Sequence, residues 1–136
     1  MANSGYVVIQ GDQARKLEMD GDKLVAGFTK EFQIDGKDSG QSAILILMVK
    51  GLVGDAEPID VAINGASIGK IYPDKNGDVE TWRTQILHFS ASEGSLKPNA
   101  KSEETTNTIA IPADGSKPSF AKVYIQNLVC FYKLAD

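Results

Sequence analysis

The chain has 136 residues, a length typical of a single domain, and apolar side chains make up 42% of it, enough for one core. Its formal net charge of −4 excludes the basic footprint of a nucleic-acid-binding protein and electrostatic docking on an anionic membrane. The longest apolar run, residues 43–49, is too short to cross a bilayer. The N-terminus shows no secretory signal, and one cysteine allows no internal disulfide, so we expect a cytoplasmic protein.

The first third of the chain carries short β-rich runs separated by turn residues. Residues 6–9 form the first run. Residues 16–34 predict a hairpin, or two strands joined by a tight turn at 20–22, where glycine tolerates positive φ. A short helix over residues 12–17 is the alternative. Residues 35–40 form a polar loop with two glycines.

The middle of the chain contains one fully apolar run and one alternating run. Residues 42–49 are apolar on both faces and lie between turn residues, which favours a central strand covered on both sides. Residues 59–64 alternate between apolar and polar positions, as in a half-buried strand. The dipeptide Asn64-Gly65 predicts a type I′ hairpin turn, since both central residues of that turn need positive φ. Residues 68–72 form the short return strand.

A further strand is expected over residues 82–91. Alternation places Leu87 and Phe89 on one of its faces. The opposite face carries Trp82 and His88, which are the only tryptophan and the only histidine of the chain. A shared face makes these two side chains candidates for one surface site.

The last third of the chain adds two strands to an all-β domain. Residues 92–105 are a long polar stretch, residues 107–111 a short strand, and residues 120–134 the closing strand. About eight or nine strands with regularly spaced turns predict an antiparallel two-sheet β-sandwich of the jelly-roll type, with little helix. Residues 1–136 are expected to form this single domain.

Several of these patterns occur in a characteristic order. They are Val61-Ala62-Ile63-Asn64-Gly65 with Ile68-Gly69, then Trp82, Leu96-Lys97-Pro98, Asn107-Thr108-Ile109 and the closing strand Val123-Tyr124-Ile125-Gln126-Asn127-Leu128. The series resembles the galactose-binding-like β-sandwich over roughly residues 25–132. The resemblance implies a jelly-roll fold and a binding role, because many family members are carbohydrate-binding modules or lectins and others are protein-interaction modules.

No catalytic constellation is recognisable. A small hydrolase that uses His88, the only histidine, is the weakest functional alternative. Cys130 lies between Val129 and Phe131, which indicates a small buried hydrophobe and no nucleophile. We therefore expect a protein that is not an enzyme.

One acidic turn has the spacing of a calcium loop. Asp74, Asn76 and Asp78 follow the D-x-N-x-D pattern that begins an EF-hand loop. Val79 stands where that loop needs glycine, and Gln85 where it needs a bidentate glutamate. Turn chemistry explains the same composition. We expect no cofactor, with calcium at these three residues as the alternative.

The candidate ligand-binding residues are those that suit a sugar. Trp82 offers a flat ring for stacking, although core packing is the competing explanation of a lone tryptophan. His88, Arg83, Asp60 and Asn64 supply hydrogen-bonding groups, provided that the strand with Asp60 lies beside the strand with Trp82.

These observations favour a non-catalytic binding domain, with carbohydrate as the ligand class. The alternative is a structural or protein-interaction subunit that self-associates and has no small-molecule ligand. Because the strands at 43–49 and 120–134 are apolar on both faces, we also expect a homo-oligomer.

Overall fold

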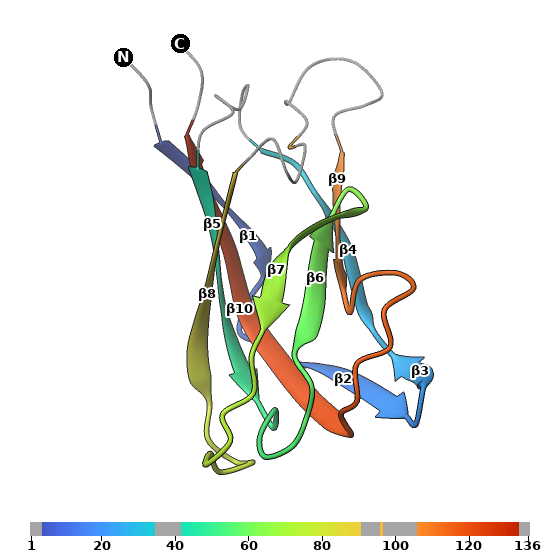
Figure 1. The fold of residues 1–136 in the computed structure, drawn as a ribbon. Helices are drawn as coiled ribbons and strands as arrows, with labels where there is room; N and C mark the ends of the chain where they lie inside the picture. The colour runs from blue at the N-terminus through green and yellow to red at the C-terminus, as the bar shows by residue number, and fades with distance from the viewer. Residues whose placement is uncertain (1–3, 35–41, 91–95, 97–105, 134–136) are drawn as a thin grey trace.

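The computed structural model describes residues 4–34, 42–90, 96 and 106–133, which form ten strands in two layers (Figure 1). The polar loop at 35–40 and most of the stretch at 92–105 lie outside the described residues. The strands are β1 (Ser4–Gln10), β2 (Arg15–Asp20), β3 (Lys23–Ala26), β4 (Phe28–Phe32), β5 (Ser42–Lys50), β6 (Ile59–Ile63), β7 (Ala66–Ile71), β8 (Arg83–Ser90), β9 (Asn107–Ile111) and β10 (Lys122–Lys133).

Both sheets are antiparallel throughout. Sheet A has the order β3-β2-β10-β5-β8, and β1 pairs with the C-terminal half of β10. Sheet B has the order β4-β9-β6-β7. The predicted two-sheet jelly-roll sandwich is thereby confirmed. In the described part of the chain, no helix is long and apolar enough to cross a membrane.

The expected hairpin in residues 16–34 is confirmed and belongs to a longer arrangement of three strands. β2 and β3 pair around the turn at Gly21, and the helix considered over residues 12–17 is wrong because β2 begins at Arg15. After Gly27 the chain passes to sheet B as β4, where Phe28 and Phe32 face the core. Leu17 of β2 is buried in the same core from the opposite sheet, because alternate residues of a strand point to one face.

One core fills the space between the sheets. Alternate residues of each strand face it, so that the two inner faces interdigitate. Its fully buried members from β5 and β10 are Leu45, Leu47, Val49, Val123, Ile125, Leu128 and Cys130. The predicted burial of Cys130 is confirmed.

Strand β5 is central in sheet A, as predicted, but only one of its faces is covered. It lies between β10 and β8, and its inward residues are buried. Its other face carries Ile44, Ile46 and Met48, which are only partly buried. The expectation of cover on both sides is wrong for the described chain, because the sandwich has two layers and β5 belongs to one of them.

Strand β10 changes the side on which its residues face at Asn127. The register against β5 shifts between Gln126 and Val129, and Asn127 has a φ of 52°. Because of this bulge, Tyr124 faces outward whereas Tyr132 is buried at 2% exposure. Strict alternation would place these two tyrosines on one face of β10, and the bulge separates them.

The hairpin of β6 and β7 contains the predicted turn. Asn64 and Gly65 have φ values of 53° and 82°, the left-handed pair that a type I′ turn requires. Gly69 has a φ of 141° and lies where the register shifts between Val61 and Ala62. An added β-carbon at Gly69 would stand 3.2 Å from Leu87 of the other sheet. Gly69 thus lies at an irregularity of the β6–β7 pairing and close to a side chain of sheet A.

Candidate functional site

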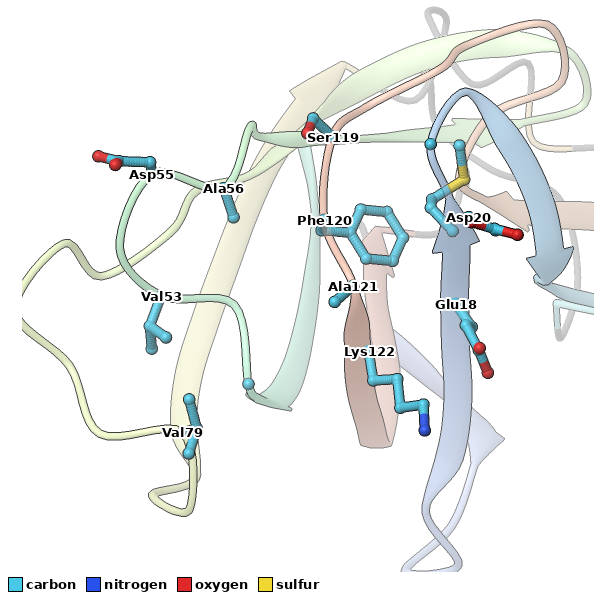
Figure 2. A pocket seen from close by; sticks show the side chains of 13 residues that line it. Glu18, Asp20, Val53, Asp55, Ala56, Val79, Ser119, Phe120, Ala121 and Lys122 are labelled. Atoms are coloured by element: carbon cyan, nitrogen blue, oxygen red, sulfur yellow. The ribbon is translucent and has the colours of Figure 1, made fainter.

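The connections at one end of the sandwich line a recess of about 740 Å³ that is open to solvent (Figure 2). We call this cavity the end recess. Its walls come from the β2–β3 hairpin, the segment after β5, the segment before β8 and the residues that lead into β10. Pocket volumes of this order are typical of small-ligand sites.

The end recess has an apolar interior and a charged rim. Phe120 lies between the walls, close to Ala56 and Ala121, and is only 8% exposed (Figure 2). Glu18 lies on one wall and Asp55 on the other, with their carboxylates turned away from the centre (Figure 2). Lys122 is the cross-strand partner of Glu18 and brings a positive charge to the same rim.

A second recess of about 320 Å³ adjoins the first and shares Lys122 and Val79 with it. Lys50, Tyr124 and Glu80 complete its polar and aromatic lining. We call this recess, together with the neighbouring Trp82, the aromatic corner. It lies at the end of the outer face of sheet A.

Strand pairing explains why these aromatic groups meet. Tyr124 of β10 is the cross-strand partner of Lys50 of β5, and Trp82 immediately precedes β8, the other neighbour of β5. The Lys50 ammonium lies 5.0 Å from the centre of the Trp82 ring and 5.3 Å from the centre of the Tyr124 ring. Both distances are within the range of cation–π attraction, so Lys50 holds a fixed place between two half-buried rings.

Arg83 makes hydrogen bonds to the protein backbone at this end of the sandwich. It is the cross-strand partner of the inward-facing Val49, and its guanidinium donates hydrogen bonds to the carbonyl oxygens of Leu52 and Tyr72. Burial lowers the pKa of Arg83, and the neighbouring Asp74 carboxylate opposes that shift. Arg83 therefore ties together the two segments that border the recesses, and its hydrogen bonds go to the protein.

The structure does not bring the five predicted ligand residues together. Trp82 and His88 share the outer face of sheet A, as predicted, but stand at opposite ends of β8. Asp60 and Asn64 belong to the β6–β7 hairpin of sheet B, so the strand adjacency that was needed to join them to Trp82 is absent. Alternation within β6 does not tell which sheet the strand joins, so the sequence could not show that the condition for grouping Asp60 and Asn64 with Trp82 is not met.

Asn64 is a structural residue of the hairpin. Its amide group donates to the side-chain oxygen of Asn107 at 2.9 Å and accepts the backbone N–H of Thr108 at 2.9 Å. Asn107 is fully buried, so this pair links the turn to β9 at little cost in unsatisfied polar groups. Asn107 thus bonds across the fold to the turn between β6 and β7.

Asp60 lies in a separate groove on sheet B, of about 340 Å³. Its carboxylate forms an ion pair with Lys70 at 3.6 Å. The rest of the lining consists of small and polar residues, Thr29, Ala62, Gly65, Ser67, Thr108, Ala110, Ala113, Asp114 and Ser116. Among the residues that the structure describes, no aromatic ring lines this groove, so they offer a sugar hydrogen bonds but no stacking surface.

The acidic turn at 74–78 uses its side chains to hold its own backbone. Asp74 accepts the N–H of Asn76, and Asp78 accepts the N–H of Glu80 at 2.8 Å. Among the described residues no group of three histidine, cysteine or acidic side chains is arranged to hold a metal ion. The contacts are those of an acidic turn, and calcium binding at Asp74, Asn76 and Asp78 stays an untested alternative.

Sequence reasoning missed Lys50, Lys122 and Phe120. Lys50 and Lys122 look like ordinary strand-end lysines, and Phe120 like the start of a core strand. Their roles depend on which strands pair: Tyr124 with Lys50, and Lys122 with Glu18. No signal in a single sequence states that pairing.

The chain is similar to solved structures but not to any family model or curated sequence. A family 35 carbohydrate-binding module from Clostridium thermocellum aligns with a TM-score of 0.48 and 16% identity, over 96% of this chain and 98% of that one. A family 29 carbohydrate-binding module from Piromyces equi aligns with a TM-score of 0.48 and 10% identity, over 95% and 91%.

A third similar structure is a Stig cyclase from Fischerella, with a TM-score of 0.47 and 11% identity, over 100% of this chain and 77% of that chain. Binding modules and an enzyme thus resemble this sandwich to nearly the same degree.

Proposed function

We propose that the protein is a non-catalytic carbohydrate-binding domain and that the sugar binds at the aromatic corner. The observation that carries this proposal is the placement of Trp82 and Tyr124 on either side of Lys50, beside a recess lined by Glu80 and Lys122. Flat rings offer surface to the C–H face of a sugar ring. Lysine donates hydrogen bonds to sugar hydroxyls, and glutamate accepts them.

The end recess extends this site. It shares Lys122 and Val79 with the aromatic corner, so a chain of more than one sugar unit could continue from one recess into the other. The openness of both recesses at the end of the sandwich suits a binding surface. His88, the candidate base of the hydrolase alternative, lines none of the recesses described, and its cross-strand partner is Ile44. This placement supports a binding role over hydrolysis.

A glycan array tests the ligand class, and calorimetry with the best oligosaccharide tests the site. We expect Trp82→Ala and Tyr124→Ala each to weaken binding roughly tenfold, equivalent to about 1.4 kcal/mol, because each loses a stacking surface. Tyr72→Ala is the matched control, since Tyr72 is 58% exposed and lines none of these recesses. Failure of every glycan to bind, or full affinity in both site variants, would contradict the proposal.

A further inference from the structure

The outer face of sheet A carries a continuous apolar surface on four adjacent strands. We call it the apolar face. Its members come from β1, β10, β5 and β8 and are Tyr6, Val8, Phe131, Val129, Ile44, Ile46, Met48 and Ile86. Figure 1 shows β1, β5, β8 and β10 as one layer, with sheet B on its other side.

The register places these side chains in rows across the sheet. Val8, Val129, Ile46 and Ile86 follow one another as cross-strand partners. Tyr6, Phe131 and Ile44 form the next row, in which the rings of Tyr6 and Phe131 are 6.0 Å apart. Such a surface is unusual, since soluble monomers seldom expose continuous apolar patches of more than a few hundred square ångströms.

The polar groups beside these rows are turned toward the protein. The amide groups of Asn127 and Gln126 both point at the sulfur of Met48, at 3.4 Å and 4.0 Å. The members of the apolar face carry no charge. His88 continues the second row at the edge strand β8 as the partner of Ile44, Lys133 lies at one end of the face, and Lys50 and Lys16 lie at the other end. A partner seated on the centre of this face would therefore bury no unpaired charge, which is the condition for a favourable apolar contact.

The face is also large enough for the core of a dimer interface. Four strands at about 4.8 Å spacing and nine residues of β5 at about 3.3 Å each give a projected area of roughly 600 Å² for this side of the sheet, and the apolar rows, which span Ile44–Met48 on β5, make up about half of it. A stable interface buries about 800 Å² on each partner and consists of an apolar core with a polar rim, so the apolar face has the size of such a core and the polar residues around it would form the rim.

We propose that the apolar face binds the same face of a second copy of this chain. A flat apolar surface is complementary to itself, and two twisted sheets commonly pack face to face about 10 Å apart. None of the recesses described above is lined by a residue of the face. The dimer therefore adds to the proposed sugar binding without replacing it.

Sedimentation of the full chain at micromolar concentration tests the dimer. We expect the parent to sediment as a dimer, and Val8→Lys and Ile86→Lys to raise the dissociation constant by at least about a hundredfold, because each places a charge in the contact. These residues are 56% and 54% exposed, so both variants keep the monomer fold. The milder Ile86→Thr, which preserves a β-branched side chain, should weaken the dimer less.

Val25→Lys is the matched control. Val25 is 55% exposed on β3, and β2 with Lys16 and Glu18 separates it from the apolar face. This variant should dimerise like the parent. A parent that stays monomeric up to hundred-micromolar concentration, or a dimer that both face variants leave intact, would overturn the proposal. Binding of a monomeric parent to neutral lipid vesicles would overturn it as well.

Discussion

At the scale of single residues, Asn64 shows how a surface-like amide becomes part of the framework. Its side chain joins the β6–β7 turn to β9 through Asn107 and the backbone of Thr108. Asn107, the partner in the first contact, is fully buried. The residue therefore contributes to stability, and its left-handed backbone adds a second reason for asparagine at this place.

We expect Asn64→Ala to lower the free energy of unfolding by about 2–3 kcal/mol, since it leaves a buried acceptor and a backbone N–H without this partner. Urea denaturation measures the change. Asn76→Ala is a control in another turn, because Asn76 contributes its backbone N–H, and not its side chain, to the hydrogen bond with Asp74. Equal stability of Asn64→Ala and the parent would contradict this role.

Arg83 is the second residue with a role that differs from the expected one. We expect Arg83→Met, which keeps the apolar stem, to lower the free energy of unfolding by about 1–2 kcal/mol, since two carbonyl oxygens lose a charged donor. Binding of any confirmed glycan should weaken as well, because the segments around both recesses lose their tie. A variant that loses stability and keeps full affinity would show that Arg83 does not position the site.

At the scale of elements, the strands were predictable and their partners were not. Alternation in β6 and β8 and the Asn-Gly turn follow from side-chain chemistry that acts within a few residues. The aromatic corner depends on β5 lying between β10 and β8, a long-range arrangement that no local pattern contains. For the same reason Trp82 was predictable as a candidate, whereas its neighbours Lys50 and Tyr124 were not grouped with it.

Gly69 of the β6–β7 hairpin lies close to Leu87 of the opposite sheet. We expect Gly69→Ala to destabilise the fold by about 1–3 kcal/mol, since the new methyl group meets Leu87 at 3.2 Å and the backbone φ of 141° is unfavourable for alanine. Thermal unfolding followed by circular dichroism measures this effect. Combining it with Leu87→Val, which makes room, should recover part of the loss, and no recovery would leave backbone strain as the cause.

At the scale of the whole molecule, the proposed dimer links stability to concentration. A partner that binds only the folded chain raises the melting temperature as protein concentration increases. We expect this rise for the parent and for Val25→Lys over a hundredfold range of concentration, and no rise for Ile86→Lys. Calorimetry at several concentrations measures it, and a parent melting temperature independent of concentration would argue against the dimer.

The bulge at Asn127 also determines where the closing strand can change in length. Between Gln126 and Val129 two residues of β10 oppose one residue of β5, so Asn127 is the extra one. Deleting Asn127 would leave Ile125 and Leu128 facing the core and Val129 and Phe131 facing outward. A deletion within residues 123–125 or 129–132 would turn the remainder of the strand inside out. Variation in the length of β10 that preserves the fold is thus confined to this one position.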